Sequence, residues 1–329
     1  MAHRTSAAVV AAAVGLLVAG CASAPESRPA DLPPGKTAAT DEQATDALNQ
    51  FAAATATANA EFSAEPLAGM VSEPLLETTE TSLALAEATG EEPVGPFLHA
   101  AVNAYSPRFT EYPTWFLSTS LIDNDPSRVS VQVMTREDPS TDWFVEHSVG
   151  LGAAVLPEIS ETGEVPEATD EQAARVDDVL QQVLGHLETG EDLEGLDLSG
   201  FGNYRDWVEN STIQQEQVTD PAVSCAVDDR VPVRSIGTVD GVLGVALLSC
   251  TITQQIRETI DATMSLGGEL AELAPETGRR VEFVSSHPLV VSVSEDGTAD
   301  AYSGGWRWAR VTMHEQREQA NNNDESSDE

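Results

Sequence analysis

The six residues ATDEQA occupy positions 39–44 and recur unchanged at positions 168–173. In each copy a Thr is followed three residues later by Gln, with Asp and Glu between them. This is the pattern of a capping box whose acids lie at the positive end of a helix dipole. Two helix starts in a chain rich in Ala, Thr and Glu can also converge on this cap. Because segments of similar order follow both copies, we interpret the repeat as the start of two halves with one plan.

The first half predicts helices followed by a sheet. Apolar residues at helical spacing between Ala44 and Phe62 predict a long helix, and shorter helical segments are expected at 67–76 and 82–88. Three later segments rich in β-branched and aromatic residues predict strands: 114–122, 129–136 and 143–151. Turns rich in Asp, Asn and Pro join these strands, so we expect an antiparallel meander with the helices on one face.

The second half repeats this order after a joint rich in Pro and Glu. One apolar stripe from Ala173 to Leu187 predicts an amphipathic helix that ends toward Gly190. A shorter helix is expected near 204–208, and a further helical stretch at 256–273. The predicted strands are 223–227, 231–238, 242–254, 289–294 and 306–313, with Asp240-Gly241 as a hairpin turn between the second and third.

These patterns predict an α+β protein with two tandem helix-plus-antiparallel-sheet halves, each cone-like, after a lipoprotein signal peptide and linker. The expected domains are 39–160 and 161–315, and together they exceed one average domain in length. A helix followed by a curved antiparallel sheet is similar in plan to the cystatin-like and NTF2-like cone folds.

The N-terminus has the order of a lipoprotein export signal. Residues 1–20 combine a basic start with an uncharged run too short to span a bilayer, and the small residues Ala19 and Gly20 precede Cys21. The resemblance to bacterial lipoproteins implies that the Cys21 thiol takes a diacylglyceryl group and anchors the chain to membrane lipid outside the cytoplasm. The alternative is an ordinary signal peptide cut near 22–24, with a chance cysteine.

Segments without a core-forming pattern flank the two predicted domains. Residues 21–38 contain several prolines and few large apolar residues, which predicts an extended tether behind the lipidated cysteine. Residues 316–329 are polar and acidic, so we expect a disordered tail there.

The chain is strongly acidic, with 55 Asp and Glu residues against 16 Lys and Arg residues and a formal net charge of −39. It has no basic run that could replace counterions on phosphates, so nucleic acid is not an expected partner. The acids are spread through the whole chain, which favours a solvated acidic surface. A surface for cations or for a basic partner is the alternative.

Export to an oxidising compartment favours a disulfide between Cys225 and Cys250, which both lie in predicted strands. A regular hairpin around Asp240-Gly241 would place Cys250 opposite Val231. The bridge therefore requires the strand that begins at Val223 to fold back beside the end of the strand that contains Cys250. Two separate buried thiols are the alternative.

Motifs of common enzyme classes are absent from the sequence. Cys-x-x-Cys, His-Glu-x-x-His and Gly-x-Ser-x-Gly do not occur, and Lys36 is the single lysine, which excludes Ser-x-x-Lys and P-loop chemistry. The segment at 123–127 begins like a calcium loop, but Arg128 and Met134 replace residues that such a loop needs, so we interpret it as a turn. We therefore expect no catalytic residues, no metal site and no cofactor.

Three residues are weak candidates for contact with a ligand. His147 lies in a predicted strand next to Glu146, where acid-base chemistry is conceivable, although histidines on a sheet surface are far more often structural. Trp306 and Trp308 share a strand face and could stack on a sugar or a lipid; packing in the core is the alternative that we favour.

The motif at Cys21, the proline linker, the helix start at Thr40 and the late strands together resemble an uncharacterised family of secreted actinobacterial lipoproteins. That resemblance implies location and fold, and it implies no activity. We expect a non-catalytic binding or interaction module whose partner is an envelope protein or a small ligand. The alternative is an enzyme or lipid-binding protein of cone fold. A sheet-lined pocket with a His or a carboxylate at its base would favour the enzyme.

Overall fold

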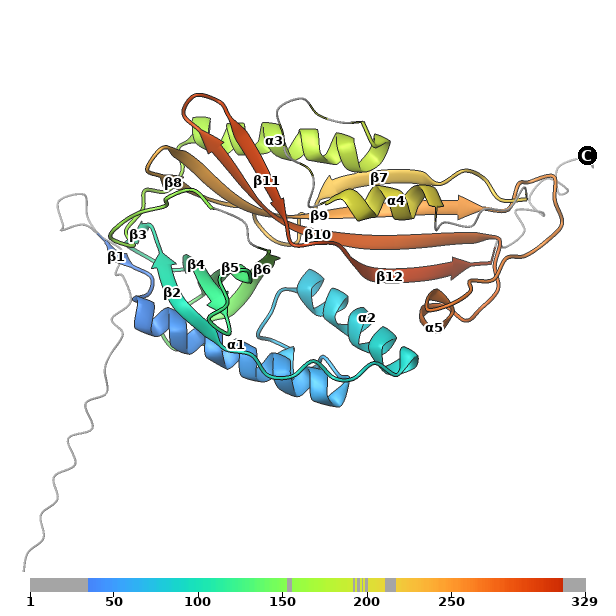
Figure 1. The fold of residues 1–329 in the computed structure, drawn as a ribbon, viewed down its shortest axis with the longest axis horizontal. Coiled ribbons are helices and arrows are strands. Elements are labelled where there is room, and N and C mark those ends of the chain that lie inside the picture. Colours follow the sequence, from blue (N-terminus) through green and yellow to red (C-terminus); the bar gives the residue numbers. More distant parts are fainter. Residues whose placement is uncertain are drawn as a thin grey trace, which may run out of the picture.

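The computed structural model describes residues 35–152, 156–191, 193, 196, 198, 201–210 and 217–315. Within them the chain is a mixed α+β protein, which confirms the predicted class (Figure 1). The predicted signal peptide, Cys21, most of the tether and the acidic tail lie outside the described residues. None of the helices in the described part is both long and apolar enough to cross a membrane.

The first half contains two long helices and a small sheet. Its elements are β1 (Lys36–Thr37), α1 (Asp41–Glu61), the 3₁₀ turn η1 (Glu65–Leu67), α2 (Glu73–Thr89), β2 (His99–Tyr105), β3 (Arg108–Phe109), β4 (Thr114–Ile122), β5 (Val129–Arg136) and β6 (Phe144–Leu151). The sheet order is β2-β4-β5-β6 and each neighbouring pair is antiparallel, so the predicted meander is confirmed and gains β2 at one edge.

The second half contains a larger sheet built on two long strands. Its elements are α3 (Asp170–Thr189), α4 (Gly202–Asn210), β7 (Ala222–Val227), β8 (Arg234–Thr238), β9 (Gly241–Gln255), α5 (Leu270–Leu273), β10 (Arg280–Ser294), β11 (Ala299–Ser303) and β12 (Arg307–His314). β9 and β10 pair along their whole length. β7 and β8 share the outer edge of β9, and β11 and β12 share the outer edge of β10.

Both copies of the ATDEQA repeat form the predicted capping box. The Gln43 backbone N–H donates to Thr40 Oγ1 at 3.3 Å, and the Thr40 N–H donates to Gln43 Oε1 at 3.1 Å. Thr169 and Gln172 make the same pair of bonds at the start of α3. Each cap satisfies two backbone N–H groups that have no partner inside the helix.

Three predicted elements have different bounds in the structure. The helical segment expected at 67–76 is wrong before residue 73, because residues 68–72 are not helical. Its end joins the segment expected at 82–88 in one helix, α2, and Pro74 lies in the first turn, where a missing N–H breaks no hydrogen bond of the helix. The helix expected at 256–273 is wrong except for α5, and Gly268 interrupts that stretch with a φ of +60°.

The strand expected at 289–294 begins much earlier, at Arg280, and runs through Pro288. Proline is normally excluded from a central strand because it cannot donate to the ladder. Pro288 lies where the outer neighbour of β10 changes from β12 to β11, and its carbonyl accepts from the Gly304 N–H on that side. Because the N–H of a strand residue points to the same side as its carbonyl, no ladder bond is lost there.

The two halves pack sheet against sheet, so that four layers run helices, sheet, sheet, helices (Figure 1). Trp115, Leu117 and Val133 of the first sheet share one buried cluster with Leu243 and Val290 of the second. The outer face of the first sheet packs on α1, and the outer face of the second packs on α3 and α4. The structure therefore does not confirm two tandem cone-like halves.

Helix α2 leaves the first half and lies along β12 of the second. The Thr81 hydroxyl in α2 donates to the carbonyl of Ala309 in β12 at 2.7 Å. This contact places α2, the small sheet and the long sheet around one common space, which is the candidate site.

Candidate functional site

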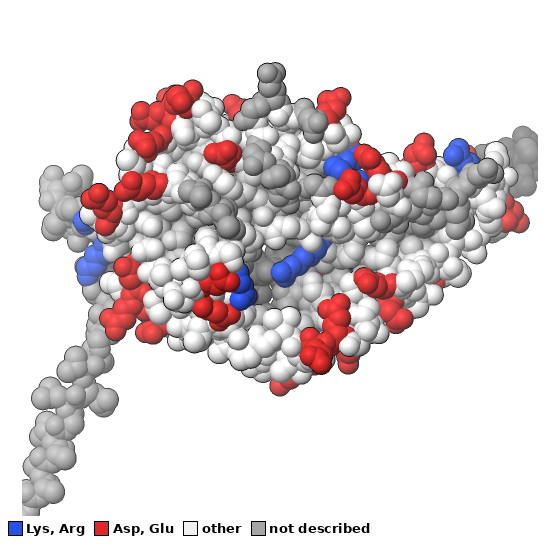
Figure 2. Space-filling model, in the orientation of Figure 1, with Lys and Arg blue, Asp and Glu red and all other residues white. Residues whose placement is uncertain are grey.

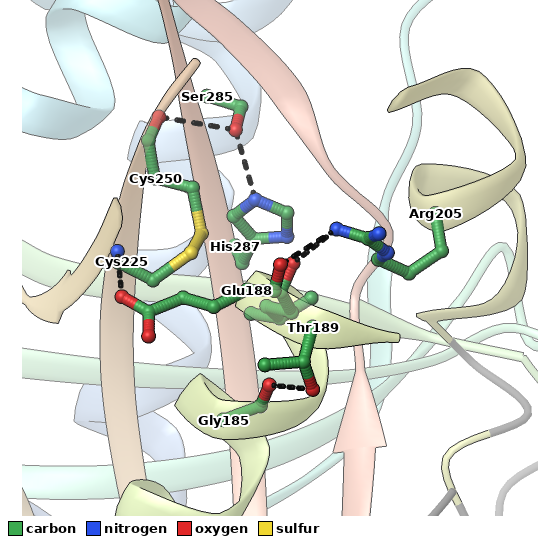
Figure 3. Close-up of a disulfide and its surroundings, with 9 residues drawn as sticks. Gly185, Glu188, Thr189, Arg205, Cys225, Cys250, Ser285 and His287 are labelled. Atoms are coloured by element: carbon green, nitrogen blue, oxygen red, sulfur yellow. Dashed lines mark hydrogen bonds between the residues drawn. A yellow bond between two sulfur atoms is a disulfide. The ribbon is translucent and has the colours of Figure 1, made fainter. Parts of the chain in front are cut away.

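The Cys225–Cys250 disulfide is present in the structure (Figure 3). The two cysteines are direct partners on β7 and β9, with Cα atoms 4.1 Å apart. β8 pairs with the first five residues of β9, and β7 pairs further along the same edge. The chain therefore folds back beside the end of β9, as the bridge required.

The polar groups around the disulfide belong to the core of the second half (Figure 3). The Cys225 N–H donates to Glu188 Oε1 at 2.7 Å, and the Ser285 hydroxyl lies 2.9 Å from His287 Nε2. His287 is fully buried, and this burial lowers its pKa to about 3. The Tyr204 ring packs edge-on against it at 4.5 Å. A neutral histidine enclosed in this way is a packing group.

Trp306 and Trp308 lie in an aromatic cluster of the second half. Their rings are 4.7 Å apart, and Trp207 of α4 packs edge-on against Trp308 at 4.6 Å. The Trp306 indole N–H donates to Asn203 Oδ1 at 3.0 Å. Both tryptophans are partly buried against the core of the second half, which is the arrangement that core packing requires.

A cleft of about 590 Å³ lies between the two halves. Figure 2 shows a hollow near the centre of one face, with basic side chains beside it. One wall is α2, a second is the small sheet and a third comes from β10 and the start of β12. The lining is mixed: apolar side chains from both helices and the 90–98 segment face polar side chains from β2, β5 and β6.

His147 is the one sequence-predicted contact residue that the structure brings to the cleft. It is 3% exposed, and its Nε2 donates to the Pro232 carbonyl at 2.8 Å, because a carbonyl can only accept. Burial lowers the pKa of His147, so the ring is neutral at pH 7. The neighbouring Glu146 carboxylate is held by Arg234 through two hydrogen bonds of 2.6 and 2.7 Å.

His99 also lines the cleft, and sequence reasoning missed it. The residue is 5% exposed, and its Nδ1 lies 2.8 Å from the Ser120 hydroxyl. Its Nε2 is buried and has no hydrogen-bond partner in the described structure. Burial lowers the pKa of His99 to about 4. The unsatisfied atom itself has almost no accessible surface, so a ligand would reach it only after a small movement of its surroundings.

Arg307 is the second group that sequence reasoning missed. It begins β12 beside Ser286 of β10, and both residues line the cleft. Arg307 is an exposed residue, although nearby protein atoms lower its pKa by partial desolvation. Its guanidinium nevertheless stays charged at neutral pH. Among the residues that the structure describes, no carboxylate forms an ion pair with Arg307, whereas Arg128 on the same cleft pairs with Asp123 at 2.9 Å.

No sequence motif marks His99 or Arg307, because the cleft forms only where two distant parts of the chain meet. The single local hint is that Arg307 stands between the two tryptophans already singled out. Within the described residues, no group of three or more His, Cys, Asp or Glu side chains is placed to hold a metal ion.

Comparisons with known proteins place the chain in a family without assigning an activity. A protein-family model described as a domain of unknown function (DUF8094) matches residues 36–227, from β1 to β7. No curated protein and no solved structure matches the chain. Because the family match spans more than half of the chain, this protein belongs to the DUF8094 family.

Proposed function

We propose that this protein is a lipid-anchored, extracytoplasmic envelope protein that binds a small ligand in the cleft between its two halves, without catalysing a reaction. The observation that carries the proposal is the cleft itself. Its volume of about 590 Å³ falls in the usual range for ligand pockets, and its walls combine apolar side chains with a few polar groups. The motif at Cys21 supports anchoring to the outer face of the cytoplasmic membrane, in an actinobacterial host.

The chemistry of the cleft favours a binder over an enzyme. A general base works best when its pKa is near the working pH, and His99, with a pKa of about 4, is a weak base at pH 7. Glu146 is fully engaged by Arg234, and His147 uses Nε2 to bond a backbone carbonyl. Among the described residues, the one hydroxyl that bonds a cleft histidine is that of Ser120 beside His99, and Ser120 does not line the cleft.

One observation favours the enzyme as a second candidate. A sheet-lined cleft with two histidines and a carboxylate on one wall is an arrangement that favours an enzyme of cone fold. Turnover of a bound compound by the purified protein would establish that alternative, because a binding protein returns its ligand unchanged.

The anchor is tested by Cys21→Ser, with Ser23→Ala as the matched control. The wild-type protein and the control should partition into the detergent phase of a membrane extract. Cys21→Ser should appear in the aqueous phase or keep its signal peptide, because no acyl chain can be attached. A cleaved Cys21→Ser protein that stays with the membrane would contradict the anchor.

The ligand is tested by native mass spectrometry of the full chain purified from its own membranes. The wild-type protein should carry a bound compound that solvent extraction releases. Ala86→Trp, which fills the cleft from α2, should carry much less, whereas Ala84→Trp on the exposed side of the same helix should match the wild type. A wild-type protein without any bound compound, or an Ala86→Trp protein that is equally loaded, would contradict the cleft as the binding site.

A further inference from the structure

An uncompensated positive charge lies in the cleft of a very acidic protein. The chain carries a formal net charge of −39, and its other cleft arginine is paired with a carboxylate. Arg307 has no such partner in the described part of the chain, and it is an exposed residue on the cleft wall, where a ligand can reach its guanidinium. A guanidinium forms two parallel charge-assisted bonds to a carboxylate or phosphate, so an anion that enters the cleft has a bidentate partner there.

The two acidic residues that line the cleft do not cancel this charge. Glu146 is neutralised by its paired bonds to Arg234. Glu91 is an exposed residue just after α2, where water and salt screen its carboxylate. An anion at Arg307 therefore meets little repulsion from within the cleft.

Another part of the cleft lining is apolar. Leu75 and Leu83 of α2 line it, and so do Val94 and Phe97 of the segment that joins α2 to β2. Val94 is 66% exposed. Apolar side chains that face water at the mouth of a cleft lower their free energy when an apolar ligand covers them.

His99 adds a second polar group on the wall of the small sheet. Its Nε2 is buried and lacks a hydrogen-bond partner in the described structure, and the residue as a whole is only 5% exposed. A polar atom of a ligand that reached this nitrogen would remove the free-energy penalty of leaving it unsatisfied.

We infer that the cleft binds an amphipathic anion, with a carboxylate or phosphate head group on Arg307 and an apolar body against α2 and the 90–98 segment. This inference rests on the proposed function and names the chemical class of its ligand. It requires three features at once: a negative head group, an apolar body and a molecule small enough for one cleft.

The test measures binding by calorimetry to the full chain in one neutral detergent, so that loss of probe to micelles is the same in every arm. The probes are octanoate, octyl phosphate and the uncharged octanol. The variants are Arg307→Gln and its matched control Arg310→Gln, an exposed arginine on the same strand that does not line the cleft. Thermal unfolding of each variant shows that it is folded.

For the wild-type protein, at least one of the two anions should bind at least tenfold more tightly than octanol. Arg307→Gln should weaken the binding of that anion by roughly 10- to 100-fold, as expected for the loss of one charge-assisted contact, and should leave the affinity for octanol unchanged. Arg310→Gln should remain within about twofold of the wild type, since it is a distant surface change. Preference for octanoate or for octyl phosphate distinguishes a carboxylate ligand from a phosphate head group.

Three results would overturn the inference, and they are distinguishable. Equal binding of octanol and the anions, with no effect of Arg307→Gln, would show a cleft that binds apolar molecules without reading charge, and the proposed function would stand. Anion binding that survives Ala86→Trp, or no binding of any probe by a folded wild-type protein, would count against the cleft as the ligand site and against both proposals.

Discussion

The two halves begin with the same six residues and the same capping box, but only the second fills the face of its sheet. In the second half, α3 buries Val176, Leu180, Val183 and Leu187 against β9 and β10. In the first half, the buried residues of α1 include four alanines, and Thr55 and Asn59 near the end of the helix line the cleft. The same start therefore leads to a packed core in one half and an open cleft in the other.

The difference shows that side-chain volume, and not the local helix signal, decides where a cleft forms. Interiors pack as densely as organic crystals, so a helix that presents large apolar residues leaves no space. Gly244 of β9 adds to this in the second half, because a Cβ there would lie 2.6 Å from Val176 Cγ1 and push α3 away. Small and polar residues along α1 leave volume that only a ligand or water can occupy.

The largest expected effect comes from the same truncation in both halves. Phe283→Ala removes a side chain that is 1% exposed and packs on Trp207 and Trp308, and it should lower the free energy of unfolding by about 3–5 kcal/mol. Phe97→Ala trims a half-buried residue that already borders the cleft, so we expect a loss of about 1 kcal/mol or less. Urea unfolding measures both.

Equal losses of unfolding free energy in Phe283→Ala and Phe97→Ala would contradict the difference between a packed core and an open cleft. That result would mean that the cleft is as tightly packed as the core, and a ligand would then have to displace protein atoms to enter.

The next effect concerns the two histidines with strongly lowered pKa values. His287 has a folded-state pKa of about 3 and His99 of about 4, both below the ordinary 6.5. The unfolded chain therefore takes up protons below pH 6.5 that the folded protein does not. Each histidine lowers stability by about 1.4 kcal/mol per pH unit as the pH falls from 6.5 toward its folded pKa, and contributes no loss above pH 6.5.

Between pH 6 and pH 5, His287→Phe and His99→Phe should each lose about 1.4 kcal/mol less stability per pH unit than the wild type. Urea unfolding midpoints of each variant and of the wild type at both pH values measure this difference. All other titrating groups are common to the three proteins, so they cancel. A His99→Phe slope equal to the wild-type slope would show that water in the cleft solvates the His99 ring. An unchanged slope in His287→Phe would contradict the sealed core of the second half.

Local features of the fold could be predicted from the sequence, because each depends on a few adjacent residues. The two capping boxes, the strands β4 to β6 and the hairpin turn at Asp240-Gly241 have the expected bounds to within a few residues. The disulfide followed from export and strand placement. β2 was missed, and β10 was predicted only from residue 289, because Pro288 has the sequence signature of a boundary.

The candidate site could not be predicted in the same way. His99 and Arg307 are more than 200 positions apart in the chain, and they share a cleft only because one sheet packs face to face on the other. The alternation of apolar residues shows that a strand has two faces to bury, and it does not show which partner covers each face. Arg307 then has no sequence signal, because what sets it apart from Arg128 on the same cleft is that no carboxylate of the described residues forms an ion pair with it.

The smallest expected effect on stability concerns the capping box that the two halves share. Thr40→Ala and Thr169→Ala each remove the side-chain acceptor of one capping box, and each should lower the free energy of unfolding by about 1 kcal/mol. Thr40→Ser and Thr169→Ser keep a hydroxyl in place and should stay close to the wild type. Because the two caps make the same bonds on exposed helix starts, the two alanine variants should lose the same amount. A much larger loss at Thr169 would mean that α3 depends on its cap to hold the packed core, and the difference between the halves would then begin at the repeat itself and not in the helix residues that follow it.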